Sequence, residues 1–153
     1  MSARKKFWNP ECPTSVRIGS AFLFISALSW SAGQVELLGT GISRENVWLC
    51  WYQANAATLY AVIGFKAAQA LARMSELAYW AVVGFLGIFA SLLFATALAT
   101  YPTWVVWPTS RVEWFGLVAM GAGSISFTSL VSRPTIRPFW QKLVQRFRSR
   151  DVT

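Results

Sequence analysis

The chain has 153 residues, room for one domain, and 55% of them are hydrophobic while only 13% are charged. A soluble domain carries about 25% charged residues, so the composition excludes an ordinary soluble globule, and its apolar content excludes disorder. The net charge is +8 and histidine is absent, which excludes Ser-His-Asp and Cys-His catalysis and histidine-ligated zinc, haem or chlorophyll. These properties predict a small, basic, all-α protein that crosses a membrane several times.

Four intervals without charge are each long enough for a membrane helix, which needs about 20 mostly apolar residues. They contain 18, 20, 34 and 19 residues and lie between Arg17 and Glu36, Glu45 and Lys66, Glu76 and Arg111, and Glu113 and Arg133. The alternation of apolar and polar residues that marks barrel strands is missing. The expected fold is therefore a polytopic four-transmembrane-helix bundle over 17–132, with spans near 17–38, 47–72, 77–100 and 113–132.

Residues 1–16 are expected to form a cytoplasmic tail ahead of the first span. The main alternative is a cleaved signal peptide, because three basic residues at 4–6 precede an apolar run that contains small residues. The basic region of such a peptide would be 17 residues long and would contain Pro10 and Pro13. That length and composition favour a span that is retained.

Polar side chains recur at helical offsets along the second span, at Asn55, Lys66 and Gln69. An ionisable group inside a span is a functional hypothesis by default. Together with Glu36 at the outer end of the first span, these residues form a candidate polar path for a solute or an ion. The alternative is that the Lys66 amine reaches the cytoplasmic headgroups and that Glu36 is solvated at the outer rim.

An outer segment between the third and fourth spans is rich in aromatic residues and contains two prolines that break helices. Tryptophan prefers the headgroup level of a bilayer, so we expect Trp104, Trp107 and Trp114 to anchor this segment at the outer interface. Binding of a partner or a lipid is the alternative role.

Small residues are frequent in the fourth span, and we take Gly116, Ala119, Gly121 and Gly123 as candidate helix-packing residues. Small side chains let two helices approach closely and gain van der Waals contact. Two interpretations remain open: packing inside one bundle, or self-association of several chains through this span.

The basic tail at 133–153 is expected to be cytoplasmic and to contain an amphipathic helix over about 138–149. Aromatic and aliphatic residues recur there at helical offsets, with basic residues on the other faces. We expect Trp140, Lys142 and Arg146 to lie at the lipid interface, with the apolar face on lipid and the basic face toward anionic headgroups. Docking to a cytoplasmic partner is the alternative.

The distribution of lysine and arginine predicts the orientation of the chain. An even number of spans places both tails and the middle loop on one side, and that side carries twelve of the fourteen basic residues. The positive-inside rule then predicts cytoplasmic termini, as suits a bacterial inner membrane. The expected partner of the positive charge is a bilayer with anionic headgroups, and no nucleic acid is expected.

We expect no catalytic residue, no metal and no cofactor. Cys12 and Cys50 fall on opposite sides of the predicted topology, and the chain has no paired carboxylates, no G-x-S-x-G and no Walker motif. The leading functional hypothesis is a non-catalytic integral membrane protein, either a small accessory or scaffold subunit or a self-associating bundle that forms a homo-oligomer. The second is a holin-like or pore-forming protein, and the third is a transporter of a small solute or an ion.

Overall fold

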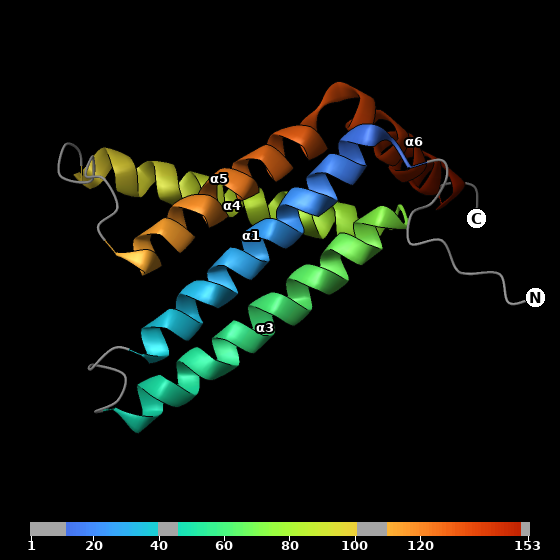
Figure 1. Ribbon diagram of the computed structural model, residues 1–153. Helices are drawn as coiled ribbons and strands as arrows, with labels where there is room; N and C mark the ends of the chain where they lie inside the picture. The colour runs from blue at the N-terminus through green and yellow to red at the C-terminus, as the bar shows by residue number, and fades with distance from the viewer. Residues whose placement is uncertain (1–11, 40–45, 101–109, 151–153) are drawn as a thin grey trace, which may run out of the picture.

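The computed structural model describes residues 12–39, 46–100 and 110–150, the side chains of 93–100 and 149–150 excepted. These residues form five helices and no strand, which confirms the all-α prediction (Figure 1). The helices are α1 (Thr14–Leu38), α3 (Val47–Ala72), α4 (Glu76–Thr100), α5 (Arg111–Val131) and α6 (Arg133–Arg150).

The first four of these helices occupy the four predicted intervals, with ends that differ by three residues or fewer. Capping residues explain two of the starts. The Asn46 side chain accepts hydrogen bonds from the first backbone N–H groups of α3, and Ser110 and Glu113 form a reciprocal capping box at the start of α5.

The last helix begins five residues earlier than predicted. The sequence interpretation started it at Pro138, but α6 begins at Arg133 and contains Pro138 inside it. Its first turn is closed by the Ser132 carbonyl, which accepts from the N–H groups of Thr135 and Ile136. The N–H groups of a first turn have no partner inside the helix, so Pro134 is accommodated there, whereas Pro138 removes one hydrogen bond from the ladder.

Two helices in the described part of the chain, α1 and α5, are long and apolar enough to cross a membrane. The described side chains of α4 form a shorter apolar helix over Glu76–Leu92. Although α3 has 26 residues, it is not among the helices that pass this test, and its polar residues include Gln53, Asn55, Lys66 and Gln69. The four-transmembrane bundle is therefore only partly supported, and the crossing of the membrane by α3 and α4 stays a prediction.

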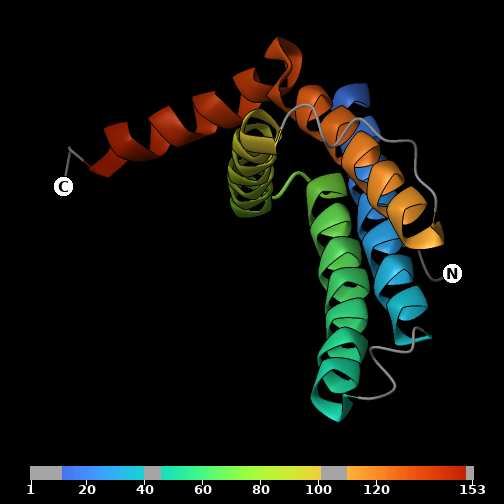
Figure 2. The same ribbon diagram turned by 90° about the vertical axis from the view of Figure 1, so that its left-hand side faces the viewer.

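Three of the helices pack as one layer with α1 in the middle. α1 runs antiparallel to α3 on one side and to α5 on the other (Figure 1). α4 makes far fewer contacts with this layer and is inclined steeply to α3 (Figure 2). The predicted fourth member of the bundle thus joins the others through its first turns, and further along through an edge-to-face contact between Phe89 and Trp30 of α1 at 6.2 Å.

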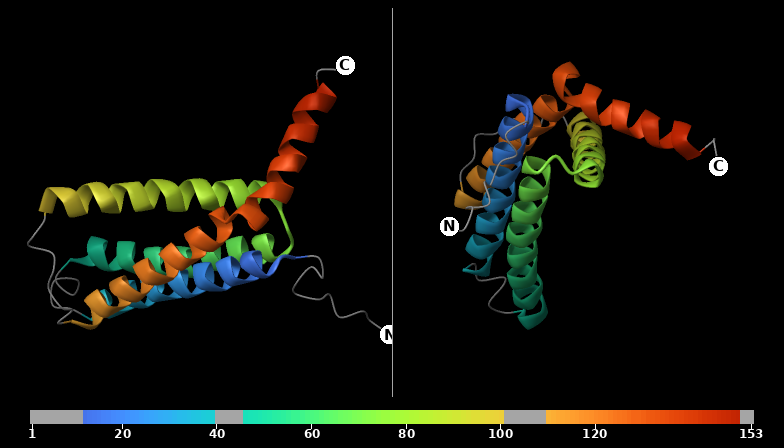
Figure 3. Two further views of the ribbon diagram at one scale, coloured as in Figure 1. Left: turned by 90° about the horizontal axis from the view of Figure 1, so that it is seen from above. Right: turned by 90° about the vertical axis from the view of Figure 1, so that its right-hand side faces the viewer.

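The large buried side chains gather at one end of the molecule. There α1 begins, α3 ends, α4 begins and α5 ends, and α6 projects away from this junction (Figure 3). The fully buried residues of this cluster are Val16, Leu71, Tyr79, Leu130 and Phe139. Along the rest of the layer, α1 makes its closest approaches through small side chains, and two ring pairs, Phe24–Phe65 and Trp30–Tyr60, add contacts with α3.

Candidate functional site

Close backbone approach and two hydroxyl hydrogen bonds join α1 to α5. Ser26 Oγ on α1 donates to the Ala119 carbonyl oxygen at 2.7 Å, and Ser126 Oγ on α5 donates to the Gly19 carbonyl oxygen at 2.7 Å. Both serines are buried. A Cβ atom on Gly19 would lie 2.8 Å from the Leu130 side chain, so this position admits no larger residue without a shift.

The opposite side of α1 packs on α3 in the same manner. Ser31 Oγ donates to the Ala57 carbonyl oxygen at 2.8 Å. A Cβ atom on Gly64 would overlap that of Ala27. Small residues and hydroxyl groups therefore line both faces of the central helix, as is common where membrane helices pack.

The four candidate packing residues of α5 divide into two pairs. Ala119 is only 1% exposed, and the Cβ position of Gly123 lies 3.4 Å from Ser26 Oγ, so both belong to the contact with α1. The Cβ positions of Gly116 and Gly121 meet no atom within 4 Å. This second pair contributes nothing to packing within the described chain.

The candidate polar path is not assembled within one chain. Asn55 and Lys66 are exposed. Each lies two residues from a position that faces α1, Ala57 and Gly64 respectively. Because successive side chains of a helix are about 100° apart, Asn55 and Lys66 point away from α1. Glu36 lies at the other end of the layer from Lys66. Its carboxylate is 3.9 Å from a guanidinium nitrogen of Arg111 on α5. Asn55 Nδ2 donates to the carbonyl of its own helix at Trp51, and Gln69 is half-buried.

Sequence reasoning missed an aromatic cluster between α4, α5 and α6. The Tyr79 and Phe139 rings are stacked with centroids 3.9 Å apart and planes at 4°, and Tyr79 Oη donates to the Leu130 carbonyl oxygen at 2.8 Å. Trp80 and Trp140 meet edge to face at 6.4 Å. We call these four rings (Tyr79, Trp80, Phe139 and Trp140) the aromatic joint. The expected apolar face of the last helix is thus partly buried against protein, since Phe139 is fully buried.

The residues expected at the lipid interface are exposed where they are described. Trp114 and Trp140 are about half exposed, and Lys142 and Arg146 are exposed. Trp104 and Trp107 lie outside the described residues.

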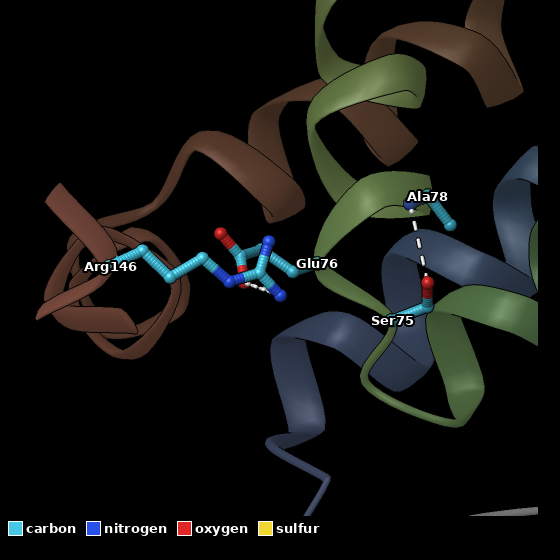
Figure 4. Close-up of polar contacts among 4 residues, drawn as sticks. All are labelled: Ser75, Glu76, Ala78 and Arg146. Carbon is cyan, nitrogen blue, oxygen red and sulfur yellow. Dashed lines mark hydrogen bonds and ion pairs between the residues drawn. The ribbon is translucent and has the colours of Figure 1, made fainter. Parts of the chain in front are cut away.

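An ion pair connects α6 to the start of α4. An Arg146 guanidinium nitrogen lies 3.2 Å from a carboxylate oxygen of Glu76 (Figure 4). The Glu76 side chain is 11% exposed and that of Arg146 is 75% exposed. Beside this pair, Ser75 Oγ accepts from the Ala78 backbone N–H at 3.4 Å and so caps the first turn of α4.

Among the described residues, His, Cys, Asp and Glu side chains do not meet in groups of three that could hold a metal ion. Three serine hydroxyls of the helical layer donate hydrogen bonds to backbone carbonyls across the helix contacts. Comparisons of the chain with known protein families, with curated proteins and with solved structures found no match.

Proposed function

We propose that the chain is a non-catalytic integral membrane protein with four spanning helices, which serves as a small accessory or scaffold subunit of a membrane complex. The observation that carries this proposal is the exposure of large apolar side chains on every long helix. The closest approaches of α1 to its neighbours are made by small and hydroxyl-bearing residues. Soluble monomers rarely expose contiguous apolar surface above a few hundred Å².

The outward apolar side chains are spread over the helices rather than confined to one docking patch. Those more than half exposed include Val35, Leu59, Val62, Ile63, Phe85, Ile88 and Leu92. A lipid environment covers such a surface on all sides. The two described helices that satisfy the length and hydropathy test, α1 and α5, adjoin each other in the layer.

The basic side chains of the described residues support cytoplasmic tails and a bacterial inner membrane. Those at or near the end where α6 begins are Arg17, Lys66, Arg73, Arg133, Arg137, Lys142, Arg146 and Arg148. The opposite end has Arg111 together with Glu36 and Glu113. The positive-inside rule assigns the basic end to the cytoplasm.

A pore formed by several copies is the second candidate. It is favoured by the outward position of Asn55 and Lys66, which would line an opening only if α3 helices from several chains surrounded it. Transport within a single chain has less support, because Glu36 and Lys66 lie at opposite ends of neighbouring helices.

The experiment that tests the proposal is purification of the full chain in mild detergent, with identification of the proteins that accompany it. A stoichiometric partner is the expected result. A homo-oligomer alone, together with loss of membrane potential on induction, would favour the pore.

The outward face of α5 offers a matched pair of variants. Gly121→Leu adds bulk where the structure has open space, whereas Ala119→Leu adds it inside the α1–α5 contact. If a partner docks on this face, Gly121→Leu should abolish its co-purification while the chain stays folded. Ala119→Leu should disrupt the fold and so serves as the reference for an unfolded variant.

A further inference from the structure

We infer that one anionic phospholipid binds between α4, α5 and α6, with an acyl chain in an apolar groove and its headgroup beside Lys142 and Arg146. This inference rests on the proposed membrane location of the chain. Two features of the described residues carry it: the groove and a basic pocket at the start of the same helix.

The groove lies between α4 and α5, where the two helices diverge. Its volume is about 550 Å³, and it is lined by Val83, Gly84, Gly87, Ile88, Ser91, Leu92, Phe127 and Val131. Two glycines keep it open. The Cβ position of Gly84 meets nothing within 4 Å, and that of Gly87 has only the Phe127 ring at 3.7 Å. The one hydroxyl of the lining, Ser91 Oγ, donates to the Gly87 carbonyl of its own helix, so it presents no free donor to the groove.

The length of the groove is close to that of one acyl chain. Val83 and Leu92 are nine positions apart, and a helix rises 1.5 Å per residue, so the groove extends for about 14 Å along α4. One acyl chain occupies half of the hydrocarbon core of a bilayer, which is about 30 Å thick.

The basic pocket lies at the start of the same helix. Glu76, Lys142, Gln145 and Arg146 line a second hollow of about 410 Å³. Two cations face one carboxylate there, so the pocket has a net positive charge. The Glu76 carboxylate holds the Arg146 guanidinium in place at 3.2 Å, and guanidinium and ammonium groups are the side chains that bind phosphate.

The two hollows follow one another along one face of α4. Glu76, Trp80 and Val83 succeed each other at intervals of four and three residues, so they occupy that face. Glu76 lines the basic pocket and Val83 lines the groove. The order of basic pocket and apolar groove is that of headgroup and tail in a phospholipid.

A second copy of this chain fits the surface less well than an anionic lipid does. The same end of another copy would bring its own Arg73, Arg133 and Arg137 toward Lys142 and Arg146. Like charges facing each other across an interface oppose association.

The test uses the full chain, reconstituted into vesicles of equal phosphatidylglycerol and phosphatidylcholine, extracted again in mild detergent and analysed for retained lipid by mass spectrometry. We expect about one phosphatidylglycerol per chain, in keeping with a single groove of one-leaflet depth. Lys142→Gln with Arg146→Gln should lower its affinity about tenfold, as does the loss of about 1.4 kcal/mol. Gly84→Leu, which fills the groove, should have a similar effect.

Gly116→Leu is the matched control. Its Cβ position also meets nothing within 4 Å, but it lies on α5 outside the groove lining, so it should retain lipid as the unaltered chain does. Helix content by circular dichroism and elution volume establish that each variant is folded, which matters for Arg146→Gln because it removes the ion-pair partner of the Glu76 carboxylate. Equal retention of the two lipids, undiminished retention in Gly84→Leu, or a change of oligomeric state without a change in lipid would each overturn the inference. Lipid retention is measured on the chain alone and the proposed accessory role on co-purifying proteins, so failure of one is distinguishable from failure of the other.

Discussion

Tyr79 on α4 donates a 2.8 Å hydrogen bond from its hydroxyl to the backbone carbonyl of Leu130 on α5. The same ring stacks on Phe139 of α6 and is fully buried. One side chain thus joins three helices at the point where α6 leaves the layer. The direction of α6, and with it the place of its basic residues, depends on this contact.

Removal of the hydroxyl in Tyr79→Phe should lower the free energy of unfolding by about 1 kcal/mol, because the stack remains while one buried hydrogen bond is lost. Phe139→Ala should lower it by about 3–5 kcal/mol, since it deletes a fully buried ring. Reversible unfolding in mixed detergent micelles measures both. Phe147→Ala is the control, because that ring is 60% exposed, and a loss there equal to that of Phe139 would contradict the role of the aromatic joint.

The serine hydrogen bonds between α1 and α5 should contribute modestly to stability. Ser26→Ala and Ser126→Ala each remove one, and interhelical hydrogen bonds in membrane proteins are worth about 0.6 kcal/mol on average. The double variant should lose about 1 kcal/mol in the same unfolding measurement. Ser124→Ala is the matched control, because Ser124 Oγ donates to Met120 of its own helix, and an equal loss there would refute the assignment to the interface.

Gly64→Ala should destabilise the contact between α1 and α3. A methyl group there overlaps Ala27, and overpacking of this kind costs about 1–3 kcal/mol. Gly121→Ala has open space around its methyl group, so it should instead stabilise α5 by about 0.5–1 kcal/mol through helix propensity. Thermal unfolding of the two variants should therefore shift in opposite directions, and shifts of the same sign would contradict the packing described for α3.

The thiols of Cys12 and Cys50 should react at different rates, in addition to lying on opposite sides of the membrane as the topology predicts. Cys12 is buried and Cys50 is exposed. Burial raises the pKa of the Cys12 thiol above its ordinary value, although Arg17 opposes this shift. Less thiolate is therefore present at neutral pH, and the thiolate is the reactive form.

An impermeant maleimide added outside intact cells should label Cys50 and leave Cys12 unmodified. Permeabilisation of the membrane should leave the labelling of Cys12 slow, and denaturation in dodecyl sulfate should make its thiol accessible to the maleimide. Labelling of a Cys50→Ala variant from outside would show that the N-terminal segment is not cytoplasmic. Arg148→Cys supplies an exposed control at the end predicted to be cytoplasmic, because a lack of labelling at the buried Cys12 is uninformative by itself.

The positions of α1, α3, α4 and α5 were predictable because charged residues are scarce and the intervals between them are as long as a membrane span. The start of α6 was not predictable, because two prolines in this segment argue against a helix. The first turn is nevertheless formed by hydrogen bonds to the Ser132 carbonyl. The steep inclination of α4 also escaped prediction. Nothing in its sequence separates the first turns, which pack through Tyr79, from the later turns, which diverge from the layer.

The candidate site was harder to predict than the fold. Gly19, Ser26 and Gly33 recur at intervals of seven in α1, and this spacing was the available signal for a small-residue seam. Its partners on α5 become evident only when the two helices are placed side by side, 93 residues apart for Ser26 and Ala119. The polar residues of α3 drew attention for their chemistry, yet the structure leaves Asn55 and Lys66 on its outer face.

The central position of α1 sets the order in which this protein can be completed during synthesis. Of the described helices, α1 is synthesised before the others; one partner, α3, follows it directly, while the other, α5, emerges after α3 and α4. Until then the Ser26 hydroxyl and the Gly19 carbonyl on α1 lack the acceptor and the donor that α5 provides. A chain that stops after α4 therefore exposes these two polar groups on α1 without their α5 partners. Their exposure distinguishes an incomplete chain from the complete one.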